Sequence, residues 1–251
     1  MTDPQIVALV APAKLTLMLR VTGVRADGFH LIDAEMVTLE LADELVVDTG
    51  RTGITINGEF AADLASASND NLVARALKLT NRQAHVTITK HIPSGGGLGG
   101  GSADAAAILR WAGFRDLVTA AKLGADVAFC MVGGRARVTG IGEVVSPLKK
   151  VARKITLVVP PFRVATPDVY RAFDELTDFC KRPIRHVGVN DLEPAAIKVE
   201  PRIALWKQKI ASAAGVEPTL AGSGSTWWLD GEFADLGAQL ADAVVITTQT
   251  N

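Results

Sequence analysis

Six glycines fall within the twelve residues 93–104, and this run points to an anion-binding site. Glycine loses more backbone entropy on folding than any other residue. Such a run therefore persists where backbone must approach a ligand closely or adopt a positive φ. The alternating segment 86–89 before it predicts a strand, and the helix formers at 105–109 after it predict a helix. We expect Ser102 to cap that helix, so that exposed N–H groups at a helix N-terminus bind phosphate.

Three phosphate-binding motifs compete for this loop. A Walker A loop needs Lys-Ser or Lys-Thr after its last glycine, whereas Ser102 and an alanine follow here. A dinucleotide fingerprint is formally present at Gly95, Gly97 and Gly100, but it requires a second strand about 20 residues later. The residues 115–123 read as a helix instead, which disfavours that motif. A glycine-rich turn without a ligand would be destabilising for no purpose.

The third motif runs from Pro93 through Gly97-Leu98-Gly99 to Ser102. It resembles the nucleotide-binding loop of the small-molecule kinase superfamily named for galactokinase, homoserine kinase, mevalonate kinase and phosphomevalonate kinase (GHMP kinases). In that loop, backbone N–H groups and a helix N-terminus hold the phosphates, and no loop lysine is needed.

Six further segments, in order along the chain, resemble one branch of the superfamily, whose members phosphorylate 4-diphosphocytidyl-2-C-methyl-D-erythritol in the non-mevalonate isoprenoid pathway. They are Ala-Pro-Ala-Lys at 11–14, Arg-Ala-Asp-Gly-Phe-His at 25–30, Leu-Gly-Ala-Asp-Val at 123–127, Gly-Ile-Gly-Glu at 140–143, Asn-Asp-Leu-Glu-Pro at 190–194 and Gly-Ser-Gly-Ser-Thr at 222–226. The resemblance covers nearly the whole chain. It implies an ATP-dependent kinase acting on the 2-hydroxyl of that substrate. The alternatives are another GHMP-type small-molecule kinase and a nucleotide-binding homologue that has lost catalysis.

Phosphoryl transfer requires a phosphate site, a cation near the transferred group and a residue that orients or deprotonates the acceptor. Lys14, on the polar face of an alternating segment, could supply the cation, and Asp126, in a turn beside glycine, could supply the general base. The resemblance implies these roles for both residues. The alternative interpretations are a surface lysine and an aspartate that caps a helix.

The resemblance also implies the two binding sites. The ATP site would comprise Pro93, Ser94, Gly95, Gly96, Gly97, Leu98, Gly99, Gly100, Gly101 and Ser102, with Asn71, Leu72 and Lys90 near the adenine. Mg²⁺ would bridge the ATP phosphates with few protein ligands, and Ser102 is a candidate contact.

On the acceptor side, a cytosine ring would stack between Phe29 and Tyr170, and His30 would bond the base edge. Thr16 and Thr166 complete the predicted substrate site. A core Phe29 and a structural His30 are the alternatives. The chain departs from the branch at Thr16, where asparagine is usual, at Phe29, where tyrosine is usual, and in a shorter segment 110–122. Ala103, Ala128 and Ala221 also replace the usual residues.

Strands and helices occur in separate runs, which favours an α+β fold over a doubly wound sheet. The resemblance implies two lobes. The N-terminal lobe, 1–150, would be similar to the ribosomal protein S5 domain 2-like fold, and the C-terminal lobe, 151–251, would be ferredoxin-like. The expected strands include 6–10, 14–21, 85–91, 135–139, 155–159 and 244–247, with two runs in 34–48, and the expected helices include 101–111, 116–123 and one through Ile203, Trp206 and Ile210.

Composition limits the other possibilities. The 251 residues are 48% hydrophobic with a formal net charge of -1, which gives no electrostatic case for nucleic acid or an acidic membrane. The N-terminus lacks a secretory pattern, and no apolar run reaches the roughly 20 residues of a spanning helix. Cys130 and Cys180 form neither a metal pair nor a disulfide framework. We therefore expect a soluble, cytoplasmic enzyme with small-molecule partners, either a monomer or a weak homodimer.

Overall fold

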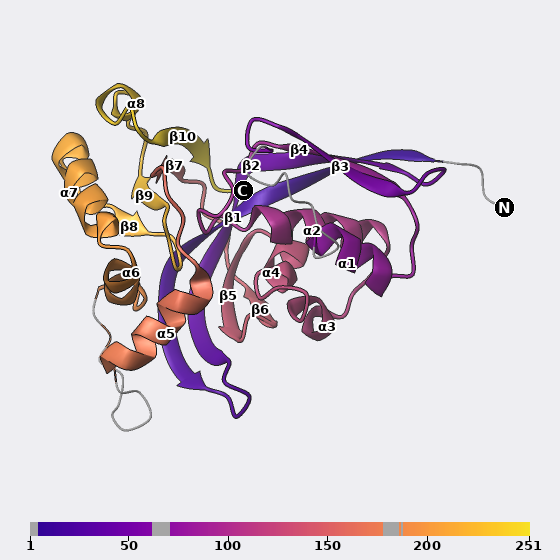
Figure 1. The fold of residues 1–251 in the computed structure, drawn as a ribbon, viewed down its shortest axis with the longest axis horizontal. Helices are drawn as coiled ribbons and strands as arrows, with labels where there is room; N and C mark the ends of the chain where they lie inside the picture. The colour runs from indigo at the N-terminus through magenta and orange to yellow at the C-terminus, as the bar shows by residue number, and fades with distance from the viewer. Residues whose placement is uncertain (1–4, 62–70, 178–185, 187) are drawn as a thin grey trace.

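The computed structural model describes residues 5–61, 71–177, 186 and 188–251, and these form two β-sheets with helices packed on them (Figure 1). The first sheet holds the first six strands in the order β3-β4-β2-β5-β6, with β1 paired to β2. Their bounds are β1 Ile6–Val24, β2 His30–Asp48, β3 Gly53–Gly58, β4 His85–Lys90, β5 Arg135–Gly140 and β6 Val144–Pro147. The second sheet has the order β10-β7-β9-β8, with β7 Lys154–Val159, β8 Thr219–Leu220, β9 Trp227–Asp230 and β10 Val244–Gln249. The predicted α+β class is confirmed.

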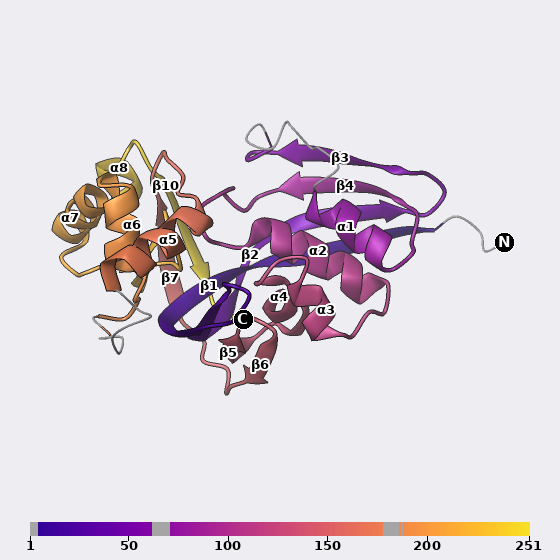
Figure 2. The same ribbon diagram turned by 60° about the horizontal axis from the view of Figure 1, so that its bottom comes forward.

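Helices α1 to α4 gather on one face of the first sheet, and α5 to α8 lie beside the second (Figure 2). The first group is α1 Leu72–Leu79, α2 Gly100–Trp111, α3 Leu117–Ala121 and α4 Val127–Val132. The second group is α5 Thr166–Thr177, α6 Glu193–Val199, α7 Arg202–Ala214 and α8 Leu236–Gln239. The apolar stripe predicted for α7 is confirmed, because Ile203, Trp206 and Ile210 are all buried. None of these helices, within the described ranges, has the length and apolar character needed to cross a membrane.

The long hairpin of β1 and β2 is the element that the sequence pattern divided wrongly. Each was expected as two short runs, but each is one strand of 19 residues. Pro12 lies inside β1, and a bulge between Pro12 and Lys14 follows it. The proline is tolerated because, among the described strands, β1 pairs with β2 alone, and its isolated bridge to Asn190 lies farther along, at Leu19.

The middle of β1 is buried on both faces, whereas its alternation predicted a half-buried strand. Leu15 packs in a cluster with Leu157 and Trp228 of the second sheet, which covers one face. On the other face Lys14 and Thr16 are also buried; Lys14 lies against Gly99, and both side chains lie near Gly222. A buried lysine in this strand needs a partner, and that requirement bears on the site described below.

Two further elements were not predicted. The apolar segment after Asp126 forms the short helix α4. The four-residue strand β6 was not predicted. The chain passes from the first sheet to the second between Pro147 and Lys154, and a division into lobes at residue 150 stays a prediction.

Candidate active site

The glycine loop joins β4 to α2, as predicted, but the helix begins earlier than expected. Gly99 is the N-cap residue, with φ 71°, and the helix starts at Gly100. Ser102 therefore lies in the first turn, and its predicted capping role is wrong. Gly99 has no side chain, so α2 has no side-chain cap. The N–H groups of the first turn have no earlier carbonyl in the helix to bond, and they give the loop its affinity for anions.

A cavity of about 410 Å³ lies against this loop. It is lined by every residue predicted for the ATP site except Gly96, namely Pro93, Ser94, Gly95, Gly97, Leu98, Gly99, Gly100, Gly101, Ser102, Asn71 and Lys90, and by Leu72. Gly96 faces the opposite way, because a Cβ built on it would come within 2.5 Å of the Thr226 hydroxyl. Asn71 also caps α1 by accepting a hydrogen bond from the N–H of Val73 at 2.8 Å.

The ammonium of Lys90 is enclosed beneath the loop by two buried carboxylates. It forms ion pairs with Asp43 and, at 2.7 Å, with Asp104. Burial raises the pKa of Asp104 to about 7, against the opposing attraction of Lys90. Burial alone would lower the pKa of Lys90, but the two carboxylates outweigh it and raise that pKa. The charge of Lys90 is thus compensated inside the protein.

This cluster also fastens the chain at both ends of the loop. Asp43 accepts hydrogen bonds from the N–H groups of His91 at 2.6 Å and Ile92 at 2.8 Å, just before the loop. Asp104 belongs to α2, just after it. Neither carboxylate was predicted from the sequence. The one available signal was the position of Lys90 on the buried face of an alternating strand, because a buried lysine needs acidic partners.

Lys14 and Asp126 meet, with 3.1 Å between Nζ and Oδ2. The Lys14 side chain is only 6% exposed and that of Asp126 is 29% exposed, so the surface-lysine alternative is wrong. Asp126 stands at the N-cap of α4 without capping it through its side chain, so the capping alternative is also wrong. The main chain of Lys14 is tied to the loop, because its N–H donates to the Leu98 carbonyl at 3.0 Å.

A second cavity, of about 540 Å³, lies on the other side of this ion pair. It is lined by all five residues predicted for the substrate, Thr16, Phe29, His30, Thr166 and Tyr170, together with Lys14 and Asp126. Gly97 and Asp126 line both cavities. The ion pair therefore stands where the two cavities meet, so groups bound in each would face one another across it.

Three aromatic side chains, those of Phe29, His30 and Tyr170, line the second cavity. Tyr170 lies against His30, with ring centroids 4.7 Å apart and planes inclined by 34°. Phe29 is 58% exposed, with the Arg25 guanidinium 5.7 Å from its ring centre. A base held between Phe29 and Tyr170 stays a prediction.

Sequence reasoning missed Asp174, whose Oδ1 lies 2.7 Å from Nε2 of His30. It lies four residues after Tyr170, and that spacing puts both on one face of α5.

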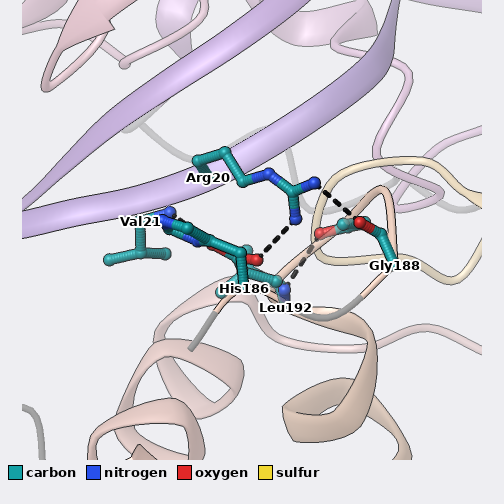
Figure 3. A network of polar contacts seen from close by, with 7 residues as sticks. Arg20, Val21, His186, Gly188 and Leu192 are labelled. Carbon is teal, nitrogen blue, oxygen red and sulfur yellow. Dashed lines mark hydrogen bonds and ion pairs between the residues drawn. The ribbon is translucent and has the colours of Figure 1, made fainter. Parts of the chain in front are cut away.

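The Asn-Asp-Leu-Glu-Pro segment fastens β1 to the helices of the second half of the chain (Figure 3). Asp191 is buried and accepts three hydrogen bonds: from Arg20 at 2.8 Å, from the Val21 N–H at 3.0 Å and from His186 at 2.7 Å. Arg20 also donates to the Gly188 carbonyl at 2.7 Å. These contacts fix the position of β1, which carries Lys14 and Thr16.

The neighbouring Leu192 lines the second cavity, and Asn190 holds the backbone beside it. Asn190 donates to the carbonyls of Leu220 at 3.0 Å and Gly222 at 2.7 Å, which holds the second glycine-serine loop in position. Its own carbonyl oxygen accepts from the N–H of Leu192 at 3.0 Å (Figure 3). Both Leu192 and Gly222 line the cavity, and Thr166 is bonded to Ser223 of the same loop at 2.8 Å.

Comparison with known proteins agrees with this geometry. The model for the GHMP kinases N-terminal domain matches residues 71–134, which contain the glycine loop and Asp126. The chain is 39% identical to the 4-diphosphocytidyl-2-C-methyl-D-erythritol kinase of Paracoccus denitrificans (strain Pd 1222), over 95% of this chain and 91% of that protein.

Solved structures agree as well. A crystal structure of 4-(cytidine 5'-diphospho)-2C-methyl-D-erythritol kinase has a TM-score of 0.74 at 29% identity, covering 98% of this chain and 99% of that one. An L. major mevalonate kinase shares the fold, with a TM-score of 0.71 at 11% identity, over 100% of this chain and 98% of that one. The resemblance drawn from the motifs is confirmed, and the chain belongs to the 4-diphosphocytidyl-2-C-methyl-D-erythritol kinase family of GHMP kinases.

Proposed function

We propose that this protein transfers the terminal phosphoryl group of ATP to the 2-hydroxyl of 4-diphosphocytidyl-2-C-methyl-D-erythritol. One observation carries the proposal: the Lys14–Asp126 pair stands between a cavity lined by the glycine loop and a cavity lined by aromatic rings. A kinase needs that arrangement, because donor and acceptor must meet at a site with a base and a cation.

The donor cavity suits the phosphates of ATP. Its loop offers backbone N–H groups at the start of α2, where the helix dipole favours negative charge. The cation closest to the transferred group would be Lys14, because its partner Asp126 lines both cavities, whereas Lys90 is enclosed by Asp43 and Asp104. Lys90 contributes by holding the loop, and its predicted direct contact with ATP would come from its alkyl chain or backbone.

The acceptor cavity suits the diphosphocytidyl group. Phe29, His30 and Tyr170 offer aromatic faces and a ring nitrogen for a pyrimidine, and Thr16 and Thr166 bring hydroxyls for the rest of the substrate. The threonine at position 16 is already bonded by Lys14, with 3.3 Å between Nζ and Oγ1. Thr16 would thus orient the lysine as well as contact the substrate.

The reaction then assigns a task to each member of the pair. The acceptor oxygen forms a bond to the γ-phosphorus while the bond from that phosphorus to the β,γ-bridging oxygen breaks and ADP leaves. The proton of the acceptor hydroxyl passes to Asp126. Lys14 holds the Asp126 carboxylate between the two cavities, and its charge offsets the negative charge on the transferred group.

The donor cavity also fits a magnesium ion carried by ATP. The hydroxyl of Ser102 and the carboxylate of Asp126 line it, and oxygen donors are those that Mg²⁺ prefers. No group of three acidic, histidine or cysteine side chains that could hold a metal ion occurs in the described ranges. When bound, Mg²⁺ would neutralise charge on the phosphates.

The two halves of the chain would act as lobes. Residues 1–150 would carry the donor site and the Lys–Asp pair, and 151–251 would close the acceptor site through α5 and the second glycine-serine loop. We propose that the enzyme works in the cytoplasm as a monomer or weak homodimer.

The test is an assay of the purified protein with ATP, Mg²⁺ and the proposed acceptor, followed by phosphorus NMR. We expect ADP and a new phosphate monoester to appear together. Turnover of homoserine or mevalonate instead would move the function to another GHMP-type kinase. ATP binding without turnover of any of the three would favour a non-catalytic homologue.

A further inference from the structure

The turn that joins β5 to β6 lies against the residue that precedes Asp126. This turn spans residues 141–143, and Gly142 at its middle is buried. A Cβ built on Gly142 would overlap the Ala125 carbonyl oxygen and come within 3.1 Å of its carbonyl carbon. The backbone of the β5–β6 turn therefore contacts the peptide that leads into Asp126, and only glycine leaves room for that contact.

The segment that carries Asp126 is held from two directions. On one side, Gly124 lies near α2, because a Cβ built on it would be 3.6 Å from the Ser102 hydroxyl. On the other side, Ala125 lies against the β5–β6 turn. Lys14 pairs with the carboxylate of Asp126 itself, at 3.1 Å. The lysine thus holds the side chain, whereas the position of the backbone depends on the two neighbouring loops.

Glu143 closes the β5–β6 turn on itself. Its Oε2 accepts a hydrogen bond from the N–H of Ile141 at 2.6 Å. The carboxylate also lies over Gly140, where a built Cβ would come within 2.6 Å of the carboxyl carbon. A longer backbone bond, of 3.3 Å, runs from the Gly142 N–H to the Thr139 carbonyl. The short bond from Ile141 is therefore the main polar contact that a substitution of Glu143 would remove.

We propose that Glu143 is a positioning residue: it closes the β5–β6 turn, whose contact with Ala125 sets where the Asp126 carboxylate lies between the two cavities. The inference rests on the proposed function, because it assumes that Asp126 receives the acceptor proton. A base must lie within hydrogen-bond distance of the hydroxyl, and a displacement of about 1 Å can lower the rate by about 100-fold.

The position of the turn separates an effect on the acceptor proton from an effect on ATP. Ile141, Ala125 and Asp126 all line the acceptor cavity. In the described part of the chain, no residue of 140–143 lines the donor cavity. A change in the turn should therefore alter turnover and leave ATP binding close to that of the unaltered protein.

Steady-state kinetics of two Glu143 variants test the role. Glu143→Ala removes the acceptor of the Ile141 N–H, so kcat should fall by about 10- to 100-fold, with KM for ATP within about twofold. Glu143→Gln keeps an oxygen that can accept this hydrogen bond, so it should restore kcat to within about threefold of the unaltered protein.

A double-mutant cycle separates positioning from a general loss of structure. In the Asp126→Asn background the base is already absent, so adding Glu143→Ala should lower kcat by less than about twofold. A general loss of structure would instead multiply the two effects. Melting temperatures of all four proteins show whether each is folded at the assay temperature.

The glycines at the two ends of β5 provide a matched pair of substitutions. Gly142→Ala places a Cβ against the Ala125 carbonyl, so kcat should fall by about tenfold or more. Gly134, just before β5, also has a positive φ, of 72°, but a Cβ there would meet only Lys150, at 3.6 Å. Gly134→Ala should therefore lower the melting temperature through backbone strain and leave kcat within about twofold.

The outcomes are distinguishable. The inference is overturned, and the proposed function stands, if Glu143→Ala keeps its kcat or if Glu143→Gln is equally impaired. Multiplied effects in the Asp126→Asn background, or equal losses of kcat in the two glycine variants, would overturn it as well. If the unaltered protein does not phosphorylate the proposed acceptor, the proposed function fails, and the inference fails with it.

Discussion

The donor and acceptor cavities lie on either side of one ion pair, yet they present different kinds of groups to a ligand. The donor cavity belongs to the first sheet and its helices, and its ligand-facing groups are mostly backbone N–H groups of a loop. The acceptor cavity draws side chains from both halves of the chain, including β1, β2 and α5. A backbone site recognises what all nucleotides share, whereas a side-chain site distinguishes one acceptor from another. A superfamily that keeps its donor and varies its acceptor benefits from this separation.

The largest effect should come from Asp126, which both cavities share. Asp126→Asn removes the proton acceptor while keeping the size of the side chain, so kcat should fall by about 10²- to 10⁴-fold. ATP affinity, measured by calorimetry, should change little. Unchanged turnover would exclude Asp126 as the base. A loss of ATP binding equal to the loss of turnover would instead assign it to the donor cavity alone.

A substitution at Lys90 tests how much the buried charges beneath the donor cavity contribute to the stability of the protein. Lys90→Met leaves Asp43 and Asp104 buried without their cation, which should lower the free energy of unfolding by about 3–5 kcal/mol. Denaturant unfolding measures this directly. Lys198→Met is the matched control, because its pair with Glu175 is exposed and should contribute little to stability. A similar loss of unfolding free energy in the two variants would show that the buried cluster contributes no more to stability than an exposed ion pair.

Alanine substitutions at two glycines of the loop test which part of the loop both cavities depend on. Gly97 has φ 81°, and a Cβ there would come within 2.8 Å of the Ala221 carbonyl oxygen, so backbone must shift. Because Gly97 lines both cavities, Gly97→Ala should raise KM for ATP and for the acceptor, at a total cost of about 1–3 kcal/mol.

The contrasting variant is Gly101→Ala. Its Cβ would meet only Leu72, at an ordinary 3.8 Å, and it lies inside α2. The free energy of unfolding of Gly101→Ala should rise by up to about 1 kcal/mol. The KM values for ATP and for the acceptor should change less than in Gly97→Ala. Equal kinetic effects of the two substitutions would contradict the geometry of the loop.

The smallest effect concerns Cys130, on the helix that carries Asp126 at its N-terminus. Burial raises the pKa of the Cys130 thiol to about 12, so the thiolate is scarce at neutral and moderately alkaline pH. Alkylation by iodoacetamide should stay slow up to about pH 10 in a Cys180→Ser background, and become fast in urea. The same slow rate in Asp126→Asn would show that α4 is intact there and that the lost turnover is chemical.

The parts predictable from sequence were those set by local pattern. The strand, glycine loop and helix around residue 95 follow from propensity and spacing, and the Lys14–Asp126 pair followed from the motifs that carry it. Asp43 and Asp104 could not be paired with Lys90, because 47 and 14 residues separate them along the chain. Ser102 was misassigned as a cap because the helix starts two residues earlier, among glycines with low helix propensity.

The continuity of β1 was missed for a similar reason. Pro12 normally ends a strand, and only the knowledge that β1 pairs on one side makes its place inside the strand intelligible. Burial on both faces of β1 also depends on the second sheet, which no local alternation reveals. What remained beyond the sequence was therefore long-range pairing.

The wall shared by the two cavities has a practical consequence. Since Gly97 and Asp126 border both, a single molecule that joins an adenosine to a cytidine through a phosphate chain could occupy both at once. Its second half would bind with the advantage of a tethered group, and its affinity would exceed that of either nucleotide alone by orders of magnitude. The optimum number of phosphates in such a bisubstrate ligand would measure the path between the cavities in solution.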